Sequence, residues 1–347
     1  MDLEYPPSIT QSLDRLSRTL GELAVQDETA ACAAEPELWA EDGPLTLTLS
    51  PEGRGEILEP AASPLAQFAE FRVMGAYAVP LGQLLARAGR AYVPLPDSAT
   101  RGAVALAWPD ATAPWHANEH LTVEIDGEEM VAGSVSVAPF CVPASRLVFL
   151  AQAAVDVALV ECSHGGSHVQ LVGDAFIVRF ERTPVRTVAL GDAALRAWER
   201  AVLWERLALV GLTAGLIDRA YRIALDALCE GQRQQSLVAG EQVAQFQLSD
   251  NYIDRLAAER LAQDVAIDAE RGRPVHEKLA LVRYFTAGQA ERSAGRALHL
   301  AALFLPSLVP IARWLTQRAH HLSVFGMARE HEVRLATVGL AAGMRLD

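Results

Sequence analysis

The hydrophobic period of this chain changes twice, and that order constrains the fold more than any other feature. The pattern is helical from Ser8 to about Pro96, alternates with a period of two from Ala103 to Leu190, and is helical again beyond Gly191. A period near 3.6 indicates helices and a period of two indicates strands. The sequence therefore predicts an α+β protein with an N-terminal helical domain (residues 1–100), a middle β domain (101–190) and a C-terminal helical bundle (191–347).

The first block is helical but interrupted. Leucine recurs at a 3-4-3 spacing within Ser12–Leu23, which buries one stripe of a helix. A polar, proline-bearing loop over Glu41–Ser63 follows, and Pro64–Gly89 is helical again. Within that last segment Pro80 either starts a helix or kinks one.

The middle block consists of short, valine-rich runs with no helical pattern between them. Asp126-Gly127 is a strong hairpin signal in this block. Such strands, joined by tight turns, predict a small antiparallel sandwich or barrel. The eight expected strands are Ala103–Ala107, His120–Asp126, Glu129–Val137, Arg146–Ala151, Asp156–Glu161, His168–Val172, Phe176–Glu181 and Val185–Leu190.

The last block predicts four helices. Asp192 is a suitable N-cap for a helix that runs to about Cys229, roughly 55 Å at 1.5 Å per residue. Further helices are expected over Val243–Ala269, Val275–Leu305 and Leu308–Val324. Helices of this length, unbroken by glycine clusters, favour an antiparallel four-helix bundle.

Composition excludes several classes of protein. The chain has 347 residues, 43 acidic against 30 basic side chains, and a net charge of −13, with no basic run. This balance argues against nucleic-acid and anionic-membrane surfaces. The N-terminus lacks the basic and apolar regions of a signal peptide, and the longest apolar stretches carry charge or proline. We therefore expect a soluble cytoplasmic protein.

Metal, disulfide and nucleophile chemistry are not expected. The four cysteines are far apart and form no C-x-x-C motif. His116-x-x-x-His120 and His164-Gly-Gly-Ser-His168 have metal-like spacing, but no third or fourth ligand stands at a recognisable spacing. Phosphate-binding glycine motifs and G-x-S-x-G are absent, so the sequence offers no nucleophile triad.

Several short motifs, in the same order along the chain, resemble those of the acyl-CoA dehydrogenase superfamily. The similar segments are Val73–Leu81 with Tyr92-Val-Pro94, Trp204–Asp218 with Arg206 before Gly211 and Gly215, Arg233-Gln-Gln235, Gln245-Phe-Gln247, and Phe325-Gly-Met-Ala-Arg-Glu-His331. The resemblance covers nearly the whole chain. It implies FAD as cofactor and α,β-dehydrogenation of an acyl-CoA thioester, with electron-transferring flavoprotein as an acceptor.

The chain departs from the family pattern at three positions. Ser323-Val324 replace the glycine pair against which the flavin pyrophosphate lies in the family, and Ser236-Leu237 replace a Phe-Gly. Trp108–Pro114 stands where the family has its T-E-x-x-x-G-S-D segment. Such a short, degenerate chain is similar to subunits of heteromeric acyl-CoA dehydrogenases, including those that act on steroid side-chain CoA thioesters. The resemblance then implies a larger dehydrogenase-like partner, a heterotetramer and flavin sites between unlike chains.

Glu205 is the candidate catalytic residue. It lies in an apolar stripe of the first C-terminal helix, and an unpaired carboxylate is costly to bury there. The stripe consists of Leu195, Trp198, Val202, Leu209, Leu212 and Leu216. In some family members the base stands at this position, so the resemblance implies that Glu205 removes a thioester α-proton. The alternative is a border glutamate paired with Arg206, Arg200 or a partner chain.

The candidate cofactor contacts follow from the resemblance. Arg233, Gln235 and Gln247 would contact flavin phosphate or adenine, or else form a solvated helix connection. His320 would replace a family glutamine, or else end an amphipathic helix. The remaining candidates are Ser323, Gly326 and Glu330. Two other functions stay open, namely a non-catalytic subunit that stabilises a catalytic partner, and a homodimer that binds an acyl ligand without redox chemistry.

Overall fold

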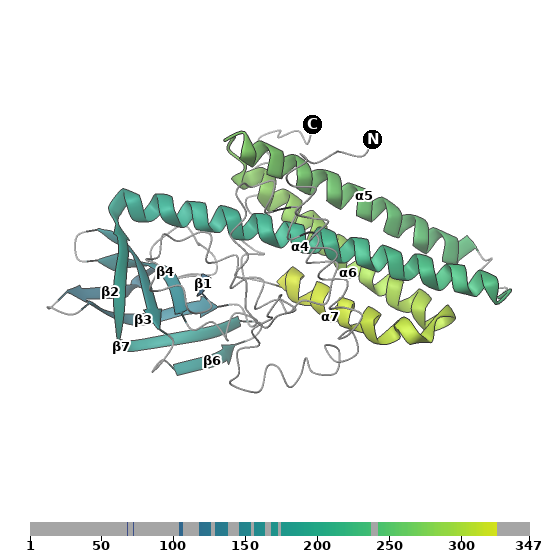
Figure 1. Ribbon diagram of the computed structural model, residues 1–347. Helices are drawn as coiled ribbons and strands as arrows, with labels where there is room; N and C mark the ends of the chain where they lie inside the picture. The colour runs from purple at the N-terminus through teal and green to yellow at the C-terminus, as the bar shows by residue number, and fades with distance from the viewer. Residues whose placement is uncertain are drawn as a thin grey trace, which may run out of the picture. The chain divides into compact units, whose positions relative to one another are not determined.

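The computed structural model divides the chain into two compact units, each considered by itself (Figure 1). A helical unit comprises residues 1–79, 207–323 and 344–347, and a β unit comprises residues 80–206 and 324–343. The described residues are 68, 72, 104–106, 118–125, 129–137, 146–153, 156–163, 168–172, 175–236 and 242–324. The expected N-terminal helical domain lies outside them, except for Phe68 and Arg72, which are both helical. The three expected domain boundaries remain a prediction.

The β unit contains seven described strands in one sheet. The strands are β1 (Val104–Leu106), β2 (Asn118–Ile125), β3 (Glu129–Val137), β4 (Arg146–Ala153), β5 (Val157–Ser163), β6 (His168–Val172) and β7 (Ala175–Leu190). The sheet runs in the order β4-β2-β3-β7-β5, and β5 pairs back onto β4, so these five strands close on themselves. Of the two expected architectures, the sandwich and the barrel, the structure therefore has the barrel.

Most strand pairs are antiparallel, as expected, but β4 pairs in parallel with both β1 and β2. The chain order explains this arrangement. Because β3 runs antiparallel to β2, it ends near the point where β2 begins. A strand that starts there and pairs with the other edge of β2 runs in the same direction as β2.

The prediction of two separate strands at the end of the β block is wrong. Phe176–Glu181 and Val185–Leu190 belong to the single 16-residue strand β7. Pro184 lies within it, although proline lacks the N–H that a strand interior needs. The reason is that β7 changes neighbour at this point: Pro184 is opposite Met130 of β3, whereas Val185 is opposite Cys162 of β5.

The barrel interior is filled by apolar side chains from facing strands. The rings of Phe149 and Phe180 stack with their centroids 5.4 Å apart. The other buried apolar residues of the described strands include Val131, Val135, Leu147, Leu150, Leu159, Val160 and Val178. Close packing of large side chains from β3, β4, β5 and β7 makes this unit a solid core rather than a pore.

Four long helices follow, at nearly the expected positions. They are α4 (Gly191–Arg233), α5 (Gln242–Glu270), α6 (His276–Phe304) and α7 (Val309–Val324), and a single 3-10 turn, Pro306–Leu308, precedes α7. In the helical unit α4 is ion-paired with α5 through Asp218 and Arg255, and side-chain hydrogen bonds join α5 to α6 and α6 to α7. This arrangement confirms the four-helix bundle. None of the described helices has a stretch long and apolar enough to span a bilayer.

Helix α4 begins directly where β7 ends. The helix starts at Gly191, so Asp192 lies in its first turn and not at the expected N-cap position. Gly191 has a φ of +57°, and an added Cβ would overlap with the carboxylate of Asp156. The same carboxylate accepts a hydrogen bond of 2.8 Å from the backbone N–H of Val157. Glycine is therefore favoured at this strand-to-helix junction, chiefly by the positive φ, because the Asp156 side chain is exposed and can move.

We expect Gly191→Ala to destabilise the β unit by about 1–3 kcal/mol, because it combines an unfavourable φ with a steric overlap. Gly272→Ala is the matched control, since Gly272 has a φ of +69° but nothing within 4 Å of an added Cβ. Chemical denaturation of the three proteins measures the effect. Equal losses for the two variants would show that the contact with Asp156 contributes nothing.

An ion-pair network connects the end of α5 with the start of α6. The ammonium of Lys278 contacts both Asp264 and Asp268, at 2.8 Å from the latter, and Arg273 also lies 2.9 Å from Asp268. The hydrogen bond from Lys278 lowers the pKa of Asp268. Partial burial lowers the pKa of Lys278, but its hydrogen bonds to the two aspartates outweigh burial and raise that pKa above its usual value.

This network predicts a pH-dependent stability. The lowered pKa of Asp268 gives stability that is present above about pH 4 and is lost as the pH falls through the folded pKa. The raised pKa of Lys278 gives stability that is present below about pH 10 and is lost at higher pH. Lys278→Met should therefore lower the free energy of unfolding by about 1 kcal/mol at pH 7.

Urea denaturation as a function of pH tests this expectation. The difference between wild type and Lys278→Met should shrink both below about pH 3 and above about pH 11. Arg271→Met is the control, because it removes an exposed cation from the same connection. A difference that is independent of pH would show that Lys278 stabilises the fold only through its apolar stem.

Candidate functional site

Glu205 lies inside the buried stripe of α4. Its side chain is 4% exposed, and the apolar residues one turn away on either side, Val202 and Leu209, are also buried. This position contradicts the expectation of a border glutamate, although pairing with a neighbouring arginine remains an alternative. Arg206, which follows it, is buried too. A carboxylate held in an apolar environment is the type of group that serves as a general base.

Arg233 and Gln235 lie together at the C-terminal end of α4. Arg233 is the last residue of the helix, its side chain is 77% exposed, and its Nη1 lies 2.9 Å from Glu230 Oε2. Gln235, two residues beyond the helix, has a left-handed φ of 53°. The N–H of Ser236 donates to the backbone oxygen of Gly231 at 3.0 Å. Such a left-handed residue after a helix directs the chain away from the helix axis. Both predicted contact residues are therefore exposed and carry hydrogen-bond donors.

Gln247 lies on the second turn of α5 and contacts a residue that the sequence did not single out. Its Oε1 is 3.0 Å from Nδ1 of His299 on α6. The two residues are 52 positions apart, so only the pairing of the two helices brings them together.

His320 and Ser323 converge on a second residue of α6, Glu291. Ser323 is 6% exposed, and its hydroxyl donates to Oε1 of Glu291. Nδ1 of His320 lies 3.4 Å from the same oxygen. The structure thus brings these two predicted residues together at Glu291. Glu291 was not predicted from the sequence because it lies more than 28 residues before both of them. Gly326 and Glu330 lie outside the described residues.

Two other kinds of chemistry were also considered. Burial raises the pKa of Cys162 to about 12, so this thiol is not a nucleophile near neutral pH. Within the described part of the chain, no group of three His, Cys, Asp or Glu side chains is arranged to hold a metal ion. His116 and His164, from the two metal-like motifs, are outside the described residues.

The fold is shared with several solved structures. The chain is similar to glutaryl-CoA dehydrogenase from Mycobacterium smegmatis, with a TM-score of 0.74 and 15% identity over 97% of this chain and 95% of that one. It is also similar to the ChsE4-ChsE5 complex from Mycobacterium tuberculosis (TM-score 0.69, 15% identity, 98% and 99% covered) and to the FAD complex of PigA (TM-score 0.72, 15% identity, 98% and 100% covered). The chain has the acyl-CoA dehydrogenase fold, which confirms the predicted resemblance at the level of the fold. No protein-family model and no curated protein sequence matches it.

The described residues fit a flavin dinucleotide at one group of candidate positions but not at the other. The exposed side chains of Arg233 and Gln235 and the half-buried amide of Gln247 carry donors that suit an anionic pyrophosphate, and Arg233 is also paired with Glu230. The position that corresponds to the family's glycine pair holds Ser323, and its hydroxyl is already bound to the Glu291 carboxylate. An anion there would lie close to a negative charge, and two unit charges 4 Å apart repel by about 1 kcal/mol in water and about 4 kcal/mol near a protein surface.

We therefore expect Glu291→Gln to increase the affinity of the isolated chain for ADP, a soluble diphosphate probe, by at least about tenfold. The reason is that the variant keeps a hydrogen-bond acceptor for Ser323 but removes the negative charge. Titration calorimetry at low ionic strength measures the change. Ser323→Ala is the control, since it leaves the carboxylate in place and should not strengthen binding. Equal affinities of wild type and Glu291→Gln would contradict electrostatic exclusion.

Proposed function

We propose that this chain is a subunit of an FAD-dependent acyl-CoA dehydrogenase that assembles with a larger, dehydrogenase-like partner and shares the flavin with it. The observation that carries the proposal is the asymmetry of the helical unit. One group of candidate residues, Arg233, Gln235 and Gln247, carries hydrogen-bond donors, with Arg233 paired to Glu230, whereas Ser323 is held against the Glu291 carboxylate near the middle of α6. A chain of this kind contributes half of an anion-binding site, and a second, different chain supplies the other half.

The reaction is α,β-dehydrogenation of a CoA thioester. Glu205 takes the proton from the α-carbon, and its buried position keeps water from competing for that proton. Bound FAD would supply the acceptor for the hydride that leaves the β-carbon. The products are the 2,3-enoyl thioester, a protonated Glu205 and reduced flavin, so that atoms and electrons balance.

The substrate and the electron acceptor are narrower parts of the same proposal. A bulky acyl group, such as a steroid side chain, is supported by the similarity to the ChsE4-ChsE5 complex and by the degenerate family motifs. The complex would be a heterotetramer, and electron-transferring flavoprotein would reoxidise its flavin.

A second function is favoured by the same Glu291–Ser323 contact. If the donors of Arg233, Gln235 and Gln247 also make no contact with flavin, the chain binds neither flavin nor substrate. Its role is then only to stabilise a catalytic partner. The burial of Glu205, at the position where the resemblance implies the catalytic base, argues against this alternative.

Replacing Glu205 by Gln separates the two functions. In the complex purified with its partner, we expect Glu205→Gln to lower acyl-CoA dehydrogenation by about 10²–10⁴-fold, as loss of a general base does, while flavin absorbance is unchanged. The matched control is Glu199→Gln, an exposed position on the same helix. Unchanged turnover in Glu205→Gln would assign the base to the partner chain and favour the structural role.

A further inference from the structure

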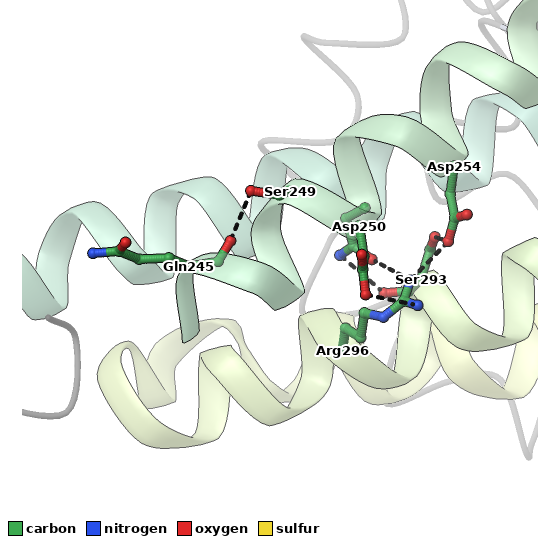
Figure 2. Close-up of polar contacts among 7 residues, drawn as sticks. Gln245, Ser249, Asp250, Asp254, Ser293 and Arg296 are labelled. Atoms are coloured by element: carbon green, nitrogen blue, oxygen red, sulfur yellow. Dashed lines mark hydrogen bonds and ion pairs between the residues drawn. The ribbon is translucent and has the colours of Figure 1, made fainter. Parts of the chain in front are cut away.

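Helices α5 and α6 are joined by a cluster of polar side chains, shown in Figure 2. Arg296 of α6 lies at its centre, with Nη1 2.7 Å from Asp254 Oδ2 and 3.3 Å from Asn251 Oδ1, and Nη2 3.4 Å from Asp250 Oδ2. Ser293, one turn earlier on α6, donates to Asp254 Oδ2 at 3.3 Å and accepts from Asn251 Nδ2 through its backbone oxygen at 3.3 Å. We call these five residues the Arg296 cluster.

The Arg296 cluster fixes how the two helices are aligned lengthwise. Asn251 and Ser293 are fully buried, and Asp254 is nearly so. Buried polar groups that lose their partners cost free energy, so a shift by one residue, about 1.5 Å along the helix axis, is strongly disfavoured. The cluster begins three residues after Gln247 on α5 and reaches to three residues before His299 on α6. It therefore holds Gln247 and His299 opposite each other.

The contact between these two residues has a defined polarity. The amide oxygen of Gln247 lies 3.0 Å from Nδ1 of His299. Because an amide oxygen only accepts hydrogen bonds, this contact is a hydrogen bond when Nδ1 carries the proton, as it does in the neutral Nδ1–H tautomer and in the imidazolium form. The NH₂ group of Gln247 is then directed away from His299.

We propose that His299 is a positioning residue that fixes the amide of Gln247, and that the group Gln247 binds is a hydrogen-bond acceptor, either a phosphate or a carbonyl oxygen of the shared flavin. The proposal rests on the proposed function in so far as the ligand is the flavin. The position and polarity of the amide come from the contacts of α5 and α6 alone.

Flavin dissociation from the complex purified with its partner tests the proposal. Gln247→Ala and His299→Phe should each weaken flavin binding about threefold to tenfold, and the double variant should be no weaker than either single one. His299→Asn should restore wild-type binding, because its amide nitrogen replaces Nδ1 as the donor. Gln247→Glu should bind more weakly than Gln247→Ala, because it presents a carboxylate oxygen to an acceptor. Ser249→Ala, on the same helix, is the control and should leave binding unchanged.

Two results would overturn the proposal while the proposed function stands. Wild-type binding in His299→Phe together with weaker binding in Gln247→Ala would show that His299 does not position the amide. Binding of Gln247→Glu at least as tight as that of Gln247→Ala would show that the ligand group is a donor.

A readout in the isolated chain does not depend on flavin. Nitrogen-15 NMR of histidine-labelled protein, with the His299 signals assigned by comparison with His299→Asn, reports which ring nitrogen carries the proton. The spectrum is recorded at a pH at which the ring is neutral, because both nitrogens are protonated in the imidazolium form, which does not distinguish the two tautomers. In the neutral ring, a protonated Nδ1 supports the positioning role and a bare Nδ1 overturns it. If the complex holds no flavin but Nδ1 is protonated, the proposed function fails and the polarity of the amide stands.

Discussion

The bridge from Arg296 to Asp250, Asn251 and Asp254 determines how α5 and α6 are aligned. Both helices bury many alanines, whose small and uniform side chains alone would not select one alignment. They include Ala258, Ala262 and Ala266 on α5 and Ala290, Ala294 and Ala297 on α6. Buried polar groups instead accept a single alignment, because each one needs its own partner. The Arg296 cluster therefore selects one alignment out of several that apolar packing would allow.

Helix α6 is the common partner of the candidate cofactor residues on the neighbouring helices. Its His299 contacts Gln247 of α5, and its Glu291 contacts His320 and Ser323 of α7. The first contact leaves a hydrogen-bond donor for a ligand, whereas the second places a carboxylate beside the hydroxyl. The chemistry of the two contact positions thus differs because of two residues on one helix. This difference is the physical basis for assigning the chain half of an anion site.

The sequence predicted the helices and most strands well, because their periods and turn signals are local. The four helices begin and end within a few residues of the expected positions. Pro184 misled the prediction, since the change of neighbour that makes it acceptable in β7 depends on strands far away in the sequence. His299, Glu291 and Arg296 were missed for the same reason. They carry no motif, and only helix pairing gives them partners, whereas the roles of Glu205 and Arg233 were inferred from resemblance and remain proposals.

The visible absorption spectrum of the purified chain tests the central claim most directly. It should be recorded for the chain alone and again after co-expression with a dehydrogenase-like chain encoded beside it. The account predicts flavin bands near about 450 nm in the co-purified sample and none in the chain alone, because this chain supplies only half of the flavin site. Flavin bound tightly to the isolated chain would contradict the shared site and would favour a homo-oligomeric flavoprotein.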